Sequence, residues 1–295
     1  MPGSNSRDGR EARDIARHRA IDVISALSTA VESLNFPDFL TWHVSCLGVG
    51  MNAVARLVNL SKRLDSDFLL DNVSIEFRAG EIVGLVGPNG SGKTTLMNLL
   101  SGALQPDIGE IWIQGRLTKL ASISSGIAEG IRLLPQFLQT YPSLSVLENI
   151  FIGQELTSEW PFPRLMAWRR MRESARCLLQ RVGAQDLDPM APAGMLSGGQ
   201  QKAVALGRLL ARPANLLIFD ESTDSLGIKQ KARLLDVMKT EAAGGRAVVF
   251  ISHDIEDVMA VCERIVVMSR GKLVYDQRRD ALDARSLAVL MMGVG

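Results

Sequence analysis

The residues best suited to chemistry form one short segment that is rich in glycine. In order they are Gly87, Pro88, Asn89, Gly90, Ser91, Gly92, Lys93, Thr94 and Thr95. An apolar run precedes the segment and a helical pattern follows it, which is the context of a phosphate-binding loop. Glycines let several backbone N–H groups point at one anion, and the start of the helix adds the positive end of its dipole. Lys93 would reach the outer phosphates of a nucleoside triphosphate, and Thr94 would give an oxygen to Mg²⁺. The alternative is a glycine-rich turn that matches the pattern by chance.

Two carboxylates follow an apolar run further along the chain. Residues 216–219 read Leu-Leu-Ile-Phe, and Asp220 and Glu221 come directly after them. In a phosphate-loop enzyme, a carboxylate at the end of such a strand holds Mg²⁺. Asp220 is placed for that role, whereas Glu221 points elsewhere and can act as a general base on an attacking water. The alternative is a strand that simply ends in solvated acids.

A second candidate anion site lies about twenty residues before Asp220, at the start of another predicted helix. Its residues are Ser197, Gly198, Gly199 and Gln200. Two glycines at a helix start expose backbone donors, and Ser197 adds a hydroxyl. The alternative is an ordinary helix start that is capped by serine.

Two further polar residues follow predicted strands. Gln136 comes after the apolar residues 133–134 and can contact both a metal and a neighbouring helical region. His253 follows the apolar run 247–251 and can donate a hydrogen bond to a terminal phosphate. Each of them alone is more often a plain loop glutamine or a structural histidine. Together with the phosphate loop, they extend the candidate site.

Composition narrows the class of protein. The chain has 295 residues, of which 46% are apolar, and it carries 33 Lys and Arg against 32 Asp and Glu. This balance gives no support for nucleic acid as a partner. Its cysteines are Cys46, Cys177 and Cys262, whose wide separation fits free thiols in a reducing compartment. No apolar stretch reaches the about 18 residues that a transmembrane helix needs, so we expect a cytosolic protein whose membrane role would need a separate membrane partner.

Strands and helices alternate from residue 51 onward, which predicts an α/β fold. We expect strands at 54–60, 72–77, 82–86, 110–113, 131–134, 215–219, 247–251, 264–268 and 272–275. We expect helices at 92–103, 145–152, 165–182, 198–211, 228–242 and 255–261. The runs 216–219 and 247–251 lack alternation, which is typical of central strands in a parallel sheet that is covered on both faces. Residues 140–211 contain no convincing strand and are interpreted as a helical insertion.

The first 50 residues differ from the rest. Their apolar residues predict an amphipathic helix over 11–34. One hypothesis is that translation begins at Met51 and that the preceding residues are an upstream artefact. The other is that they form a docking helix. We favour the first hypothesis, and the intact mass of the protein from its native host would decide between them.

The set and order of these motifs resemble the nucleotide-binding ATPase subunit of ABC transporters over about residues 57–276. Segments 126–132, 144–153 and 223–230 are similar to the importers of simple sugars such as ribose, fructose and xylose. The resemblance implies a phosphate-loop NTPase core with a mainly parallel sheet, an antiparallel β subdomain and an inserted helical subdomain. The nucleotide-binding domain would cover 51–280, with its helical subdomain at about 137–211 and a C-terminal tail at 281–295.

The resemblance also implies ATP and Mg²⁺ as cofactors, with each ATP sandwiched between two domains that dimerise head to tail. The phosphate loop of one copy would face residues 197–200 of the other, which is an identical chain or a paralogue. Metal contacts would come from Thr94, Gln136 and Asp220, and catalysis from Glu221, His253 and Gln136. Gln136 would couple the site to membrane permease subunits, which would meet residues 137–160. The protein would then lie on the cytoplasmic face of the inner membrane, and a periplasmic binding protein would act with it indirectly.

Three positions depart from that family's pattern. Leu64 stands where an aromatic residue usually stacks on adenine, Ser222 replaces a proline, and Gly227 replaces a frequent aspartate. Neither Lys93 nor Glu221 is affected, so we expect an active ATPase. The alternatives are an importer of amino acids, another ABC transporter, a non-catalytic nucleotide-gated regulator, and a soluble ATPase of translation or DNA repair. The last usually has tandem domains, coiled coils or basic arms, none of which the sequence shows.

Overall fold

The computed structural model describes residues 53–64, 67–136, 140–157, 165–223 and 226–291. The chain divides into two units, 1–50 and 51–295, and the described residues all belong to the second. The helix expected over 11–34 and the ends of the expected permease surface, at 137–139 and 158–160, lie outside the described residues. The side chain of Leu64 also lies outside the described part.

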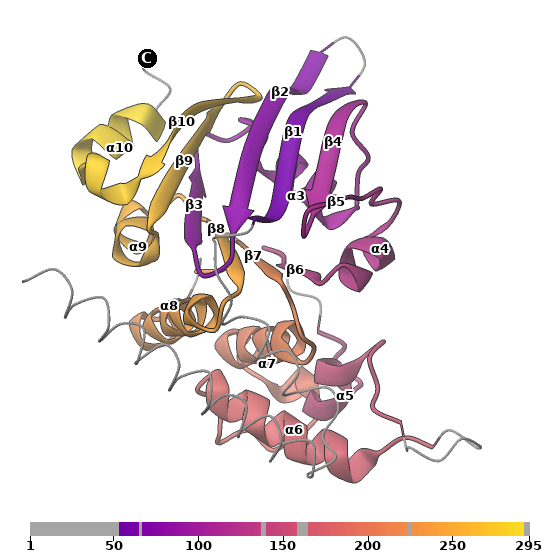
Figure 1. Cartoon of the computed structure of the whole chain (residues 1–295). Helices are drawn as coiled ribbons and strands as arrows, with labels where there is room; N and C mark the ends of the chain where they lie inside the picture. The colour runs from indigo at the N-terminus through magenta and orange to yellow at the C-terminus, as the bar shows by residue number, and fades with distance from the viewer. Residues whose placement is uncertain (1–52, 65–66, 137–139, 158–164, 224–225, 292–295) are drawn as a thin grey trace, which may run out of the picture. The chain divides into compact units, whose positions relative to one another are not determined.

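A six-stranded sheet forms the centre of the molecule (Figure 1). Its strands, in spatial order, are β10 (Lys272–Arg278), β9 (Arg264–Ser269), β3 (Ile82–Val86), β8 (Ala247–Ile251), β7 (Leu216–Asp220) and β6 (Ile131–Leu134). All neighbours pair in parallel except β10, which is antiparallel to β9. Every residue of β3 and β8 is buried, which is why their sequences are apolar runs without alternation.

The two faces of this sheet are buried in two different cores. In β7, Leu217 and Phe219 join a core with the helices on one face, while Leu216 and Ile218 join a core on the opposite face. Successive side chains of a strand point to opposite faces, so a strand that is covered on both sides needs apolar residues throughout.

A four-stranded antiparallel sheet covers one of those faces. Its order is β2 (Asp67–Arg78), β1 (Ala53–Leu64), β4 (Ile108–Ile113) and β5 (Arg116–Leu117). Together with helix α3 (Lys93–Ser101), it packs on the face of the six-stranded sheet to which Leu216 and Ile218 point. The predicted fold class is confirmed: an α/β fold with a mainly parallel sheet, an antiparallel β part and a helical insertion.

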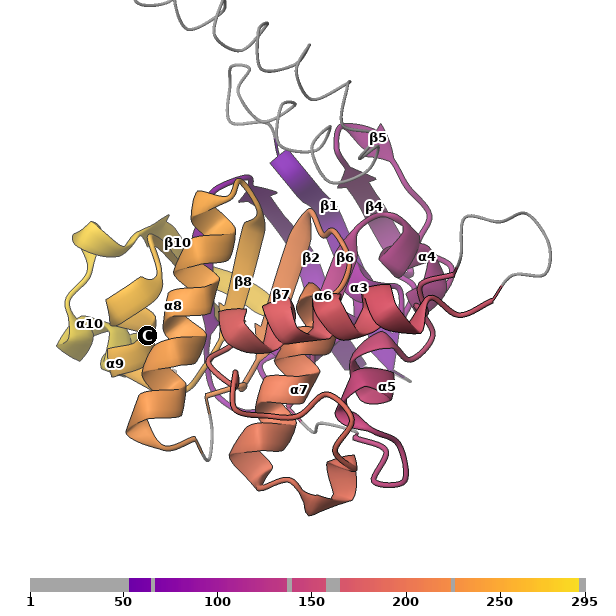
Figure 2. The same ribbon diagram turned by 90° about the horizontal axis from the view of Figure 1, so that it is seen from below.

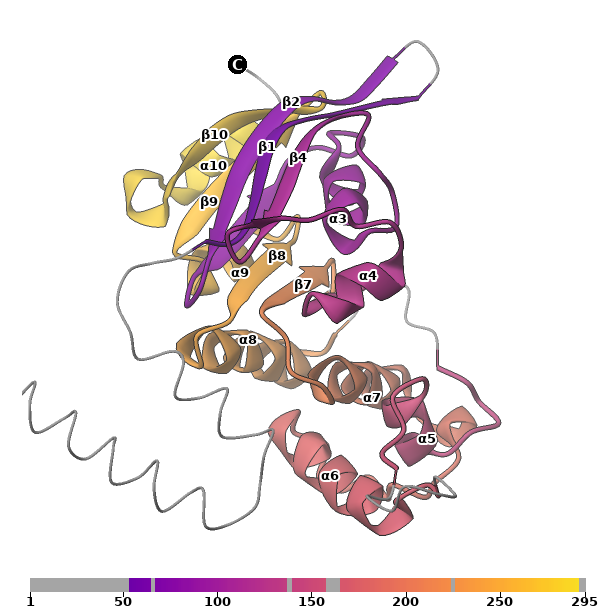
Figure 3. The ribbon, with the colours of Figure 1, turned by 45° about the vertical axis from the view of Figure 1, so that its right-hand side comes forward.

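The helical insertion lies between β6 and β7. It contains α5 (Val146–Phe151), α6 (Trp168–Arg181) and α7 (Gly198–Leu210), and it lies below the sheets in Figures 1 and 3. The short 3₁₀ helix η2 (Ala193–Met195) precedes α7. Helices α8 (Ile228–Ala243) and α9 (Ile255–Val261) follow β7 and β8 respectively. Figure 2 shows α6, α7 and α8 on the side that faces the viewer from below.

Helix α6 is joined to α8 through a buried carboxylate. The side chain of Glu241 on α8 is 1% exposed and forms ion pairs with Arg181, at the end of α6, and with Arg246. Arg233 on α8 also donates hydrogen bonds to the carbonyl oxygens of Gln180 and Arg181, at 3.1 and 2.7 Å. The carboxyl end of α6 is therefore fixed to the core of the molecule.

Five elements were not predicted, and η2 is one of them. The sequence did not predict helix α4 (Ile123–Ala128), because Ile123 and Ile127 are exposed and give no buried stripe. Ser122 and Ser125 cap the start of this helix. The sequence of β5 is too short to show alternation. The short η3 (Arg279–Ala281) precedes α10 (Ala284–Met291), which forms in the segment predicted as a C-terminal tail (Figure 3). Leu287 of α10 is fully buried. Within the described ranges, none of the helices has the length and hydropathy to cross a bilayer.

Candidate functional site

The predicted site residues follow neighbouring parallel strands. Asp220, the last residue of β7, lies opposite Ile251 of β8, and Ile251 also lies opposite Leu85 of β3. His253 follows β8, and Gln136 follows β6 on the other side of β7. Because the carboxyl ends of parallel strands meet at one edge of the sheet, the phosphate loop, the carboxylates, Gln136 and His253 gather there.

The phosphate loop has the backbone that glycine makes possible. Gly92 is the N-cap of α3 with φ 103°, and Gly87 has φ 146°. A Cβ atom on Gly87 would lie 2.2 Å from the carbonyl oxygen of Met268, so any larger residue would push the loop away from β9. The N–H groups at the start of α3 have no partner within the helix, which makes the loop a suitable cradle for an anion.

Two polar side chains of the loop are buried where they could bind a phosphate. The Lys93 side chain is buried, and its Nζ donates hydrogen bonds to the carbonyl oxygens of Gly87 at 2.8 Å and Pro88 at 3.0 Å. The Ser91 hydroxyl is buried as well and has no hydrogen-bond partner among the described residues. A buried hydroxyl without a partner is costly, and a phosphate oxygen would satisfy it. The loop therefore fits a phosphate group.

Burial and charge act against each other where Lys93 meets the carboxylates. Burial lowers the pKa of Lys93, while the negative charges of Glu221 and Asp220 act in the opposite direction. Burial and the neighbouring Glu221 raise the pKa of Asp220, and Lys93 opposes that rise. Two carboxylates beside one ammonium carry a net negative charge, so this site would attract a divalent cation.

Glu221 is held in an uncommon backbone conformation. Its φ is 44°, in the left-handed region that residues other than glycine rarely adopt, and its N–H donates to the carbonyl oxygen of Ile251 at 3.0 Å. Strain of this kind concentrates at functional sites. The side-chain amide of Gln136 donates a hydrogen bond to the Glu221 carboxylate, so these two predicted residues are in direct contact.

His253 is exposed, and the turn that carries it is fixed by its neighbours. Asp254 caps α9 by accepting hydrogen bonds from the N–H groups of Glu256 and Asp257. Lys231 on α8 forms ion pairs with Asp254 at 2.7 Å and with Asp257 at 3.0 Å. The hydrogen bond from Lys231 lowers the pKa of Asp254, and the bonds to Asp254 and Asp257 raise the pKa of Lys231.

We expect the substitution Lys231→Gln to lower the free energy of unfolding by about 1 kcal/mol at pH 7. Because the folded pKa of Asp254 is below its unfolded value, its contribution is complete above about pH 4 and is lost as the pH falls through the folded pKa. Lys231 contributes up to about pH 10, above which its proton is lost. Urea denaturation at several pH values measures both effects, and Lys239→Gln on the same helix is the control. A destabilisation that stays the same at pH 3 and pH 7 would contradict the assignment.

The segment 197–200 lies apart from the phosphate loop of its own chain. Ser197 caps α7: its hydroxyl accepts from the Gln200 N–H at 3.3 Å, and the Gln200 side chain accepts from the Ser197 N–H at 2.9 Å. Ser197 and Gly198 are exposed. No hydrogen bond between described residues joins this segment to the loop at 87–95. The start of α7 is therefore accessible at the surface of the described part.

The sequence did not predict the contacts that join the helical insertion to the core. Lys202 on α7 donates a hydrogen bond to the carbonyl oxygen of Ser222, at 3.3 Å, directly after Glu221. The Ser222 hydroxyl is buried and has no partner among the described residues, and Gly227 is the N-cap of α8. No cluster of three His, Cys, Asp or Glu side chains occurs in the described ranges.

Solved structures with this architecture define the class of protein. A nucleotide-free ATP-binding cassette from an ABC transporter superposes with a TM-score of 0.70 and 25% identity, over 82% of this chain and 99% of that one. An ATP-binding cassette of an ABC transporter in its ADP conformation gives a TM-score of 0.68 and 25% identity, over 82% of this chain and 96% of that one. An ATP-bound bacterial Atm1-family ABC exporter shares the fold at 23% identity and a TM-score of 0.69, over 83% of this chain and 43% of that one. The fold is that of an ATP-binding cassette.

Sequence comparison identifies the family. Residues 70–224 match the ABC transporter family, and the chain belongs to it. It is 38% identical over 234 residues to the ribose import ATP-binding protein RbsA of Chromobacterium violaceum, which covers 79% of this chain and 46% of that protein. It is 34% identical to an arabinose import ATP-binding protein of Burkholderia lata, over 76% of this chain and 44% of that protein. The chain thus spans a little under half the length of these curated relatives.

Proposed function

We propose that this protein hydrolyses ATP to power an ABC importer of a simple sugar. The observation that carries the proposal is the meeting of Lys93, Asp220, Glu221 and Gln136 at one sheet edge. Ser197 is exposed and has no hydrogen bond to the phosphate loop among the described residues. The names of the ribose and arabinose import relatives support the class of substrate. The cargo itself would be selected by other polypeptides.

The residues have distinct proposed roles. Residues 87–95 bind the phosphates of ATP, and Thr94, Asp220 and Gln136 hold Mg²⁺. When bound, Mg²⁺ would neutralise charge on the phosphate oxygens. Glu221 accepts a proton from the attacking water. His253 donates a hydrogen bond to the terminal phosphate.

The proposed assembly follows from the separation of the two anion sites. A second ATPase domain, identical or paralogous, brings its residues 197–200 to the ATP on this chain. The γ-phosphate then favours the closed pair, and hydrolysis removes that preference. Permease subunits would contact the helical insertion at about residues 137–160 and place the nucleotide-binding domain, 51–280, on the cytoplasmic face of the inner membrane. A periplasmic binding protein would deliver the sugar to the permease.

We expect ATP with Mg²⁺ to convert the purified protein from monomer to dimer under conditions that slow hydrolysis. Size-exclusion chromatography with light scattering would show the mass double, and Ser197→Arg would prevent the change because the larger cation blocks the opposed site. Ser286→Arg, on the exposed face of α10, is the matched control. A protein that stays monomeric with saturating ATP, alone and with its permease, would overturn the proposed assembly.

A further inference from the structure

Helix α6 presents a row of arginines on the outside of the helical insertion. In Figures 1 and 3 the helix lies at the end of the insertion that is farthest from the two sheets. Arg169, Arg172 and Arg176 are exposed, and their spacing of three and four residues places them along one face of the helix. We call these three residues the arginine stripe.

The rotation of α6 about its own axis is fixed, so the stripe cannot turn inward. Another face of the helix is buried in the core through Met171, Ala175, Leu178 and Leu179. The ion pair between Arg181 and Glu241 holds the carboxyl end. A helix whose apolar face is buried in this way leaves its charged face in water.

The stripe keeps most of its charge available for a partner. Arg169 pairs with Glu173 at 3.1 Å, but these side chains are 94% and 61% exposed, so the pair is weak and another anion could replace the carboxylate. Arg172 donates a hydrogen bond to the neutral sulfur of Met190 at 3.7 Å. No hydrogen bond or ion pair between described residues engages Arg176.

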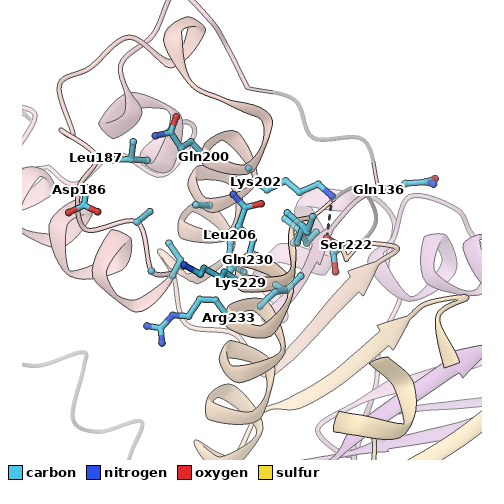
Figure 4. Close-up of a pocket in the computed structure, with 18 of the residues that line it drawn as sticks. Gln136, Asp186, Leu187, Gln200, Lys202, Leu206, Ser222, Lys229, Gln230 and Arg233 are labelled. Atoms are coloured by element: carbon cyan, nitrogen blue, oxygen red, sulfur yellow. Dashed lines mark hydrogen bonds between the residues drawn. The ribbon is translucent and has the colours of Figure 1, made fainter. Parts of the chain in front are cut away.

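The acidic residues near the two ends of α6 are not paired with the stripe. The helix itself contains five arginines and one glutamate, and residues 158–164, which are not described, contain one of each. Glu155 and Asp188 accept hydrogen bonds from backbone N–H groups at 3.0 Å. Asp186 lines a pocket together with residues of α8 (Figure 4). No ion pair between described residues joins these three carboxylates to the stripe.

Exposed apolar side chains border the stripe. Leu165 is 62% exposed, Met166 39% and Trp168 45%, and all three lie at the amino end of α6. Met166 forms an isolated β-bridge with Thr157, which fixes the backbone of this segment. Met190, in contact with the stripe, is 46% exposed. We call Leu165, Met166, Trp168 and Met190 the apolar edge.

We propose that the arginine stripe and the apolar edge bind the surface of a membrane that contains anionic phospholipids. Guanidinium groups bind phosphate oxygens through two N–H donors at once, which suits lipid head groups. Tryptophan is favoured at the boundary between head groups and hydrocarbon, and exposed leucine and methionine gain by leaving water there. The apolar edge favours lipid over nucleic acid, which offers no hydrocarbon to these side chains.

The position of the stripe agrees with the proposed function, although lipid binding does not depend on it. The proposed permease surface includes Leu156 and Thr157. Thr157 pairs with Met166, and the Ala167 N–H donates a hydrogen bond to the Leu156 carbonyl oxygen at 2.8 Å, so the start of α6 borders that surface. If a permease contacts the surface, the stripe lies next to the bilayer and lipid contact strengthens the attachment.

Co-sedimentation of the full nucleotide-free chain with vesicles tests the proposal. The probes are vesicles of phosphatidylglycerol mixed with phosphatidylcholine, and vesicles of phosphatidylcholine alone are the neutral control. We expect the chain to bind the first and not the second. Binding should weaken between about 0.1 M and about 1 M salt, because the Debye length falls from about 10 Å to about 3 Å.

The triple variant Arg169→Gln, Arg172→Gln and Arg176→Gln should weaken binding to the phosphatidylglycerol vesicles about a hundredfold. Each arginine near an anionic surface contributes a factor of about five, and the three contributions multiply. Hydrolysis of ATP without vesicles should equal that of the unmodified chain, because the stripe is no part of the proposed catalytic site. Failure of the proposed ATPase activity would therefore leave the vesicle result intact.

The matched control is the triple variant Lys119→Gln, Lys239→Gln and Arg285→Gln. It removes the same charge from three exposed positions outside α6 and should keep the affinity. Lost binding in the stripe variant, with binding kept in this control, supports the proposal. Equal loss in both variants would show attraction by net charge alone and overturns it.

Three other results also overturn the lipid surface. One is no binding to phosphatidylglycerol vesicles. Another is binding only to vesicles that carry the permease, which would assign the stripe to an acidic protein partner. The third is equal binding by the stripe variant and the unmodified chain, which would place the lipid contact elsewhere, for example in residues 1–50.

A second arm tests the apolar edge by itself. Leu165→Ala should weaken binding to the phosphatidylglycerol vesicles about tenfold, because each buried CH₂ group contributes a factor of about four. Leu117→Ala is the control, since Leu117 on β5 is 60% exposed and lies outside α6. An unchanged affinity in Leu165→Ala would refute insertion of the apolar edge.

Discussion

The substitution Glu221→Gln should lower Mg²⁺-dependent ATP hydrolysis by about 10²–10⁴-fold, the usual contribution of a general base, while ATP binding persists. Glutamine keeps the size of the side chain, and it can still accept a hydrogen bond from Gln136 through its amide oxygen. It cannot accept a proton from water at neutral pH. Since binding depends on the phosphate loop and not on Glu221, the variant should hold ATP and accumulate as the closed dimer.

The measurement is phosphate release at saturating ATP, with nucleotide binding followed by calorimetry on the same samples. Glu256→Gln is a suitable control because Glu256 is an exposed residue of α9 that uses only its backbone N–H in capping. Hydrolysis at an unchanged rate in Glu221→Gln would remove Glu221 from its proposed role. Loss of both ATP binding and ATP hydrolysis would indicate instead that Glu221, in its strained conformation, has a structural role.

The second large effect concerns stability. We expect Glu241→Ala to lower the free energy of unfolding by about 3–5 kcal/mol, the usual result of removing one partner from a buried ion pair. The Glu241 side chain is 1% exposed, and the Arg246 side chain that would lose its partner is 16% exposed. The guanidinium of Arg246 would then lose its ion pair with Glu241 while it stays largely buried.

Urea denaturation at pH 7 measures this loss. Arg181→Ala should cost only about 1 kcal/mol, because the Arg181 side chain is 43% exposed and water replaces much of what the ion pair supplies. The two variants thus compare the loss of the Glu241 carboxylate with the loss of one of its arginine partners. A change below 1 kcal/mol in Glu241→Ala would mean that water reaches the carboxylate and that the two arginines contribute little.

Sequence patterns predicted the central sheet well, and the physical reason is burial. β3, β7 and β8 lie where their apolar runs predicted, because a strand that is covered on both faces tolerates few polar residues. The starts of α5 and α7 were predicted to within one residue. In the structure Ser145 and Ser197 cap them, each with a partner three residues later. Helix α4 has no buried stripe and was missed.

The candidate site was predictable in part. Phosphate-loop geometry depends on local residue types, so Gly87 and Lys93 could be assigned roles before their contacts were known. The contact between Gln136 and Glu221 joins positions 85 residues apart, and no local pattern encodes it. The same holds for the pairing of Arg181 with Glu241, which are 60 residues apart. Such contacts arise only when the helical insertion is packed on the core.

Helix α6 is attached at one end, so a small tilt about that end displaces the other end by a larger distance. Its carboxyl end is fixed to α8 through Glu241 and Arg233, while Trp168 at its other end is 45% exposed. A helix of 14 residues is about 21 Å long, so a tilt of about 10° around the fixed end moves the other end by about 4 Å. Small adjustments at the attached end of α6 would therefore be magnified at its distal end. Shortening α6 by one turn would reduce that displacement by roughly a quarter.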